Sequence, residues 1–143
     1  MKSKATASWQ GGLKAGNGAI SADTGAFAGL PFNFGKRFEG AAGTGTTPEE
    51  LIAAAHAGCF SMALSNILGQ ANFKADSIKT EAKVTLEKVN DKMTVTKIHL
   101  STVAKVPGCD AKTFEAKAND AKAGCPISRL LAAAQITLDA KLA

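Results

Sequence analysis

The sequence is poor in the features that mark several large classes of protein. It has three cysteines in 143 residues, an odd number in a chain larger than most disulfide-stapled domains, so a structural disulfide framework is not expected. No two of them form a Cys-x-x-Cys pair, and the two histidines, His56 and His99, lie far apart. Because structural zinc sites use closely spaced Cys and His pairs, we expect no metal.

Long apolar runs and blocks of like charge are also missing. No run reaches the ~18 apolar residues of a membrane span, and the opening Met1-Lys2-Ser3-Lys4 leads into no apolar signal region. The 17 basic and 12 acidic residues give a net charge of +5, but the lysines are dispersed and not interleaved with aromatics. The Gly-Thr-rich loop at residues 42–46 lacks the Lys-Ser or Lys-Thr ending of a phosphate-binding loop. We therefore expect a cytoplasmic protein with no cofactor and no nucleic-acid or membrane partner.

The chain length and the hydrophobic content fit one domain over residues 1–143. Hydrophobic residues make up 45% of the chain, enough for a core of ordinary size. No internal repeat and no long linker divides the sequence.

The most strongly marked segment is a helix over residues 47–69. Thr47 can cap the first turn while Glu50 reaches back to the cap amide, and Pro48 occupies a position where a helix needs no N–H donor. Gly69 supplies a residue that tolerates a left-handed stop. Helical spacing predicts an apolar seam along this helix: Leu51, Ala55, Cys59 and Met62. The other faces of the helix are also rich in small and aliphatic residues, the pattern of a helix enclosed on all sides.

Alternating segments predict strands on both sides of this helix. Residues 2–10 and 18–22 indicate a hairpin, and Pro31 is expected to break any regular ladder in the Phe-rich stretch that follows. Residues 77–89 and 93–106 indicate a second hairpin around Asn90-Asp91-Lys92.

The last third of the chain predicts a second main helix and a final strand. Asp110 caps that helix and Gly124 closes it. Pro126 then opens a short helix through residue 134, and residues 136–142 form the strand. The order predicts an α+β fold, with largely antiparallel sheets packed around two main helices.

Cys59 and Cys125 are the candidate reactive groups. Cys59 lies in mid-helix, whereas Cys125 stands just before Pro126, where free backbone amides favour a thiolate. A buried cysteine is often only a small core residue. If the fold brings the two thiols together, however, the pair suggests redox cycling. One thiolate would attack a peroxide O–O bond to give a sulfenic acid, and the other thiol would condense with it to a disulfide.

Such chemistry needs a cation beside the attacking sulfur. Arg37 is the best candidate because its planar fork can hold both a sulfur and a peroxide oxygen. Glu49, in the first turn of the predicted helix, can hold the guanidinium through a bidentate pair. An ordinary surface ion pair would use the same two residues.

Two other functions stay open on the residues alone. The aromatic residues Phe27, Phe32 and Phe34 would suit a module that binds an amphiphile, although such a wall is more often plain core. His56 and Cys59 share a helix face and could form a Cys–His hydrolase site, but no third residue is evident to orient the imidazole. Cys109 follows a Pro-Gly turn and is expected to be incidental.

Several segments resemble the OsmC branch of the OsmC/Ohr family, and the resemblance covers essentially the whole chain. These are Arg37-Phe38-Glu39-Gly40, residues 47–64, Val106-Pro107-Gly108, Asp110-Ala111, Thr113-Phe114, residues 121–126 and Ile136-Thr137-Leu138-Asp139.

The resemblance implies a thiol peroxidase that reduces organic hydroperoxides better than hydrogen peroxide. It implies that Cys59 is the peroxidatic and Cys125 the resolving cysteine, and that Arg37 and Glu49 are the family's arginine and glutamate. It also implies an intertwined homodimer and reduction by a dithiol, for which lipoyl groups are a candidate. We expect Phe32, Phe34 and Phe60 to line the substrate site.

Overall fold

The computed structural model describes residues 1–143 and divides into two compact units, residues 1–51 and residues 52–143. Each unit is described by itself. The boundary falls within one long helix, which begins in the first unit and continues into the second.

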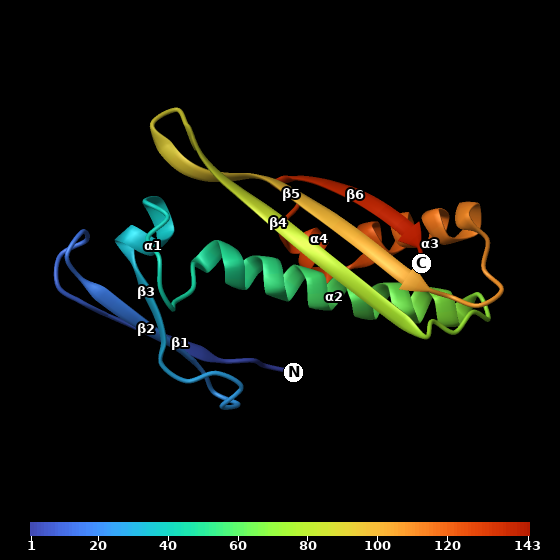
Figure 1. The fold of residues 1–143 in the computed structure, drawn as a ribbon, viewed down its shortest axis with the longest axis horizontal. Helices are drawn as coiled ribbons and strands as arrows, with labels where there is room; N and C mark the ends of the chain where they lie inside the picture. The colour runs from blue at the N-terminus through green and yellow to red at the C-terminus, as the bar shows by residue number, and fades with distance from the viewer. The chain divides into compact units, whose positions relative to one another are not determined.

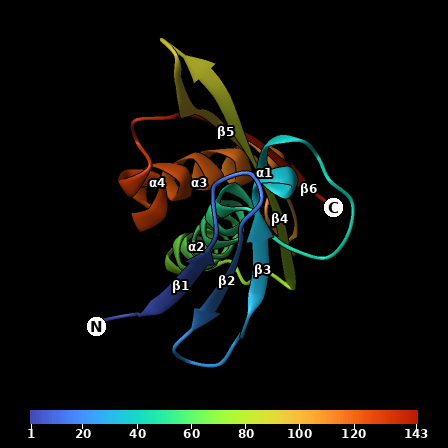
Figure 2. The ribbon, with the colours of Figure 1, turned by 90° about the vertical axis from the view of Figure 1, so that its left-hand side faces the viewer.

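The first unit holds an antiparallel sheet of strands β1 (Ala5–Gln10), β2 (Asn17–Ala22) and β3 (Leu30–Asn33), in that order (Figure 2). The hairpin of β1 and β2 confirms the prediction. Pro31 was expected to interrupt the ladder, but it lies within β3 opposite Ala19. A proline is tolerated there because β3 is an edge strand, whose outer side needs no N–H donor.

Helix α1 (Phe34–Phe38) follows β3 directly, and the sequence pattern did not predict it. Asn33 ends the strand and caps the helix, since its Oδ1 accepts a hydrogen bond from the backbone N–H of Lys36 at 2.8 Å. This turn from strand to helix fixes the position of Arg37.

Helix α2 (Pro48–Gln70) begins as predicted, with Thr47 Oγ1 accepting from the backbone N–H of Glu50 at 3.0 Å. The second half of the expected capping box is wrong. The Glu50 carboxylate instead accepts from the hydroxyl of Thr46 at 2.8 Å. The expected stop at Gly69 is also wrong, because the left-handed residue after the helix is Asn72, with φ of 62°.

The buried side of α2 differs from the predicted seam. Met62, predicted to face inward, is 76% exposed. Nor is the helix enclosed on all sides within this chain. A helix with small apolar residues on every face gives little contrast from which to choose the buried one. The buried residues recur every fourth position: His56, Phe60, Leu64 and Leu68.

Helix α2 is the one helix long and apolar enough to cross a membrane when judged by length and composition, with a mean hydropathy of 1.5. The sequence predicted no membrane span, because no run reaches ~18 apolar residues. Core helices of water-soluble proteins pass the same test.

In the second unit, strands β4 (Ser77–Val89), β5 (Lys92–Lys105) and β6 (Gln135–Leu142) form a sheet in the order β4-β5-β6 (Figure 1). The predicted hairpin of β4 and β5 is confirmed. Its two-residue turn has Asn90 and Asp91 at φ of 48° and 62°, as a hairpin turn that follows the strand twist requires. Strand β6 pairs with β5 in parallel.

Two helices link β5 to β6. Helix α3 (Ala111–Gly124) is capped by Asp110, whose Oδ1 accepts from the backbone N–H of Thr113 at 2.9 Å. Helix α4 (Pro126–Leu130) is shorter than predicted and ends four residues early. Alternate residues of β5 pack with α2 and α3 in one core. The core includes Phe60, Leu64, Leu100, Ala104, Phe114, Ala118 and Cys125.

The fold is therefore α+β, with largely antiparallel sheets and two long helices, as predicted. The single domain and the intertwined homodimer stay predictions.

Candidate active site

Cys59 and Cys125 come together in the second unit. Cys59 lies in the middle of α2, and Cys125 is the N-cap residue of α4, directly after the last turn of α3. Although the two residues are 66 positions apart, their Sγ atoms are 3.1 Å from each other, and both thiols are free. A disulfide needs about 2.05 Å between the sulfurs. The pair can therefore become covalent through a movement of about 1 Å.

The surroundings of the two thiols shift their pKa values in opposite directions. Burial, the hydrogen bond to Cys125 and the charge of that neighbour raise the pKa of Cys59. Burial also acts to raise the pKa of Cys125, but the backbone N–H of Ser128, the Cys59 thiol, the Ser128 hydroxyl and the backbone N–H of Ile127 outweigh it and lower that pKa. These surroundings therefore favour the ionised form of Cys125 over that of Cys59.

Access to the two sulfurs differs as well. Cys125 is 0% exposed, whereas Cys59 is partly exposed. Cys59 also borders a pocket of about 470 Å³. An incoming molecule can thus reach Cys59 before Cys125. The other residues around this pocket are Met62, Ala63, Asn66, Ile67, Gly124 and Pro126.

Arg37 and Glu49 form a second polar cluster, in the first unit. Arg37 Nη2 lies 2.6 Å from Glu49 Oε1, and Arg37 Nε lies 3.2 Å from each carboxylate oxygen. This fork-to-carboxylate pair joins α1 to the first turn of α2. The Glu49 side chain is only 12% exposed, against 36% for Arg37. A bidentate pair with one half-buried partner fixes the plane of the guanidinium.

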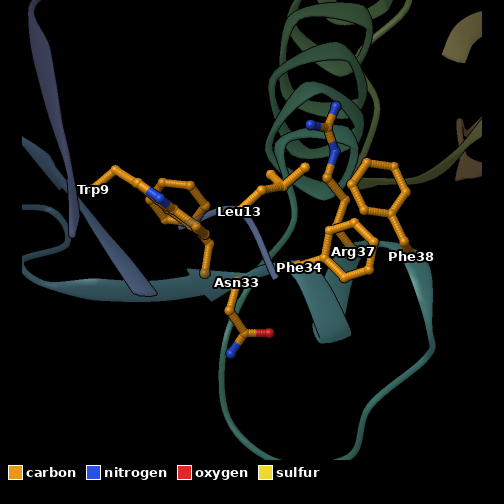
Figure 3. Close-up of a pocket in the computed structure, with 7 residues that line it drawn as sticks. Trp9, Leu13, Asn33, Phe34, Arg37 and Phe38 are labelled. Carbon is orange, nitrogen blue, oxygen red and sulfur yellow. The ribbon is translucent and has the colours of Figure 1, made fainter. Parts of the chain in front are cut away.

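An aromatic pocket of about 260 Å³ lies beside this pair. Figure 3 shows Phe34 and Phe38 close together next to Arg37, and their ring centroids are 4.9 Å apart. The Arg37 guanidinium lies 5.0 Å from the Phe38 ring, within cation–π range. Phe32 and Phe34 thus border a real cavity. Its other lining residues are Trp9, Leu13 and Asn33.

Phe60 is not among the residues that line this pocket. It is fully buried in the core of the second unit, one position after Cys59. Its predicted contact with a substrate stays a prediction.

His56 and Ser128 are neighbours of the thiol pair, and the sequence pattern did not predict their contact. His56 Nε2 lies 2.7 Å from Ser128 Oγ, and both side chains are buried. This contact spans 72 positions, so no local pattern could have found it. It also disfavours the hydrolase hypothesis, because the hydrogen bond of the imidazole goes to Ser128 and not to Cys59. The interpretation of His56 as a core histidine agrees with its burial.

The remaining candidates of the sequence have ordinary surroundings. Cys109 is half-buried, and burial and the nearby Asp110 raise the pKa of its thiol. His99 lies on β5, with Nδ1 at 2.7 Å from Thr137 Oγ1. No group of three or more His, Cys, Asp or Glu side chains is arranged to hold a metal ion.

The fold and the thiol pair together define a small α+β protein with a dithiol centre. Residues 40–141 match the family of OsmC-like proteins. Over 139 residues, 97% of this chain and 95% of the relative, the sequence is 50% identical to peroxiredoxin OsmC of Escherichia coli strain K12. The chain belongs to the OsmC family.

Solved structures show the same fold at lower identity. An organic hydroperoxide resistance protein from Elizabethkingia anophelis matches with a TM-score of 0.74 and 23% identity, over 98% of this chain and 95% of the other. The organic hydroperoxide resistance protein OhrB of Bacillus subtilis matches with a TM-score of 0.67 and 24% identity, over 98% of both chains. At this level of identity the likeness concerns the fold alone.

Proposed function

We propose that this protein is a thiol peroxidase that reduces organic hydroperoxides. The observation that carries the proposal is the pair of free thiols whose sulfurs lie 3.1 Å apart, one buried and one bordering a pocket. Membership of the family supports it, since the relative at 50% identity is a peroxiredoxin.

The proposed reaction has two steps within the protein. The Cys59 thiolate attacks one oxygen of the hydroperoxide, the O–O bond breaks, and the alcohol leaves after taking up a proton, so that Cys59 becomes a sulfenic acid. The Cys125 thiolate then attacks the Cys59 sulfur, and the departing hydroxide takes up a proton to leave as water. The resulting disulfide is reopened by an external dithiol, for which lipoyl groups are our candidate.

Access supports the assignment of Cys59 as the peroxidatic residue. A hydroperoxide must reach the attacking sulfur, and Cys59 borders a pocket while Cys125 is fully buried. The lower pKa of Cys125 suits the resolving role, because the resolving thiol must itself attack as a thiolate.

Arg37 is proposed as the cation that ionises Cys59 and stabilises the departing oxygen. The surroundings of Cys59 raise its pKa, so a further positive charge is needed to ionise it. Arg37 suits the task because Glu49 holds its guanidinium in a fixed plane. The aromatic pocket with Phe32 and Phe34 next to Arg37 would receive the alkyl group of the substrate, and Phe60 is kept as a candidate contact.

We further propose that the chain works as one domain in an intertwined homodimer in the cytoplasm, without a nucleic-acid or membrane partner. The outer face of α2 supports this, because it carries exposed apolar residues such as Met62. A second copy of the chain would remove them from water.

The test is to add one equivalent of cumene hydroperoxide to the reduced protein and to map its peptides. We expect one intramolecular disulfide between Cys59 and Cys125, with Cys109 still free. Cys109→Ser is the matched control and should give the same product. An unchanged count of free thiols, or a main product on Cys109, would contradict the proposal.

The same aromatic pocket favours a second candidate, an amphiphile-binding module. That function would survive in the double variant Cys59→Ser, Cys125→Ser, whereas peroxidase activity would not.

A further inference from the structure

The hydrogen bond between His56 and Ser128 is the one buried polar pair that the proposed reaction does not use. His56 is 0% and Ser128 is 5% exposed, and their side chains meet at 2.7 Å. The surrounding core consists mainly of aliphatic and aromatic side chains. Buried polar groups cost free energy unless they are satisfied, and one atom of this pair, His56 Nδ1, has no partner.

Each member of this pair lies three residues along the chain from one of the two cysteines. His56 precedes Cys59 by three residues on α2, and Ser128 follows Cys125 by three residues at the start of α4. Residues three apart on a helix lie on one face. The same two segments are therefore joined twice, by the contact of the sulfurs at 3.1 Å and by the hydrogen bond at 2.7 Å.

The unpartnered Nδ1 identifies the direction of the hydrogen bond. If Nδ1 carried the proton of the neutral ring, a buried N–H donor would be left without an acceptor, which is rare in proteins. If Nε2 carries the proton instead, it donates to Ser128 Oγ and leaves only a lone pair on Nδ1. Burial lowers the pKa of His56 and keeps the ring neutral. In this arrangement Ser128 Oγ accepts from His56 and keeps its own proton for another acceptor, and Cys125 begins the same helix three residues earlier.

We propose that His56 and Ser128 are positioning residues for Cys125, in which His56 Nε2–H orients the Ser128 hydroxyl so that its O–H donates to the Cys125 thiolate. Such a donor stabilises the ionised sulfur and increases its fraction at neutral pH. In this role Ser128 acts on the resolving thiol, and His56 acts through Ser128.

The consequence for turnover rests on the proposed function. When Cys59 is a sulfenic acid, the Cys125 thiolate attacks its sulfur, the new S–S bond forms, and hydroxide leaves and is protonated to water. Because only the thiolate attacks, a larger ionised fraction of Cys125 makes this step faster below the pKa of that thiol.

Other ionisable groups lie around Cys125, and the Ser128 variants change none of them relative to their common background. Cys59 and His56 face it from α2, while Lys122 on α3 and Arg129 on α4 border the cleft next to Ser128. The sheet contributes the apolar side chains of β5 and β6 to this core, among them Leu100, Ile136 and Leu138.

The first experiment measures the ionisation of Cys125 by itself. In the background Cys59→Ser, Cys109→Ser, the ultraviolet absorbance of the thiolate is followed against pH. We expect Ser128→Ala to move the midpoint of ionisation upward by about one pH unit, the scale of one hydrogen bond to a charged group. Ser128→Thr, which keeps the hydroxyl, should restore most of the original midpoint.

Two further variants test His56 and the specificity of the effect. His56→Leu should raise the midpoint as Ser128→Ala does, and His56→Gln should restore it, because the glutamine amide can donate near the position of Nε2. The matched control is Ser61→Ala, which removes another hydroxyl hydrogen bond of α2, 2.8 Å long, to Thr80 Oγ1. An unchanged midpoint in Ser128→Ala, or an equal shift in Ser61→Ala, would overturn the proposal. If His56→Leu does not fold, the Ser128→Ala and Ser128→Thr pair decides alone.

The second experiment separates this proposal from the proposed function. In the protein with all three cysteines, Ser128→Ala should form the disulfide about threefold more slowly after one equivalent of hydroperoxide, at a pH below the midpoint, because the greater nucleophilicity of the more basic thiolate offsets part of the tenfold loss in its fraction. If the wild-type chain forms no disulfide at all, the peroxidase function fails while the titration still tests the role of Ser128. If it forms the disulfide and Ser128→Ala titrates like the wild type, only the inference fails.

Discussion

Oxidation should stabilise this protein, and the size of the effect follows from the position of the two thiols. A disulfide between Cys59 and Cys125 would close a loop across 66 positions. By the chain-entropy relation, such a cross-link destabilises the unfolded chain by about 4 kcal/mol. Because the sulfurs already lie 3.1 Å apart in the folded chain, little of this gain is lost to strain. For a chain of this size the shift in Tm is about 10 °C.

The assay is thermal unfolding of the reduced and the peroxide-treated protein at equal concentration, followed by circular dichroism. Cys125→Ser should show no shift after the same treatment, and Cys109→Ser should show the full shift. Equal Tm values for the two redox states, with the disulfide proven by peptide mapping, would refute the reasoning. In that case closing the bond must distort the native fold enough to cancel the loop entropy.

Two further predictions concern the cation and the substrate. Arg37→Ala should slow the oxidation of Cys59 by about a hundredfold in stopped-flow measurements, the usual cost of one lost donor to a developing charge. Arg37→Lys should give an intermediate rate, since lysine keeps the charge without the planar fork. A normal rate in Arg37→Ala would show that another group supplies the charge. In a series of linear alkyl hydroperoxides, kcat/KM should rise about fourfold per methylene until the pocket is filled, because each buried CH₂ contributes roughly 0.8 kcal/mol. Equal kcat/KM values for all members of the series and for hydrogen peroxide would mean that Phe32 and Phe34 do not contact the substrate.

Local chemistry made much of the fold predictable from the sequence. Thr47 and Asp110 cap their helices as expected, because a hydroxyl or carboxylate reaches the N–H three residues on within a single turn. The two hairpins follow from alternation and turn residues in the same way. These signals act over a few residues and depend little on the rest of the molecule.

Features that depend on tertiary packing could not be predicted from the sequence pattern. Small apolar residues surround α2 on every side, so only packing against β5 and α3 decides that Phe60 and Leu64 face inward and Met62 outward. Pro31 is accommodated because β3 has a free edge, which local sequence does not reveal.

In the candidate site, too, some residues could be predicted from the sequence and others could not. The residue types and the family resemblance pointed to Cys59 and Cys125, and the sulfurs do meet. The pair of His56 and Ser128 was missed because its two members are 72 positions apart and each alone is an ordinary core residue.

The parallel pairing of β5 with β6 has a consequence for how the protein is made. The chain between these strands includes α3, Cys125 and α4, and the core that holds it includes Ile136 and Leu138 of β6. β6 is synthesised after β4, β5 and both connecting helices, and parallel pairing over a long connection forms slowly. During synthesis Cys59 therefore has no partner thiol until Cys125, which is 66 positions later, has been made. The redox centre is therefore completed late, once Cys125 has been made and β6 has docked beside β5.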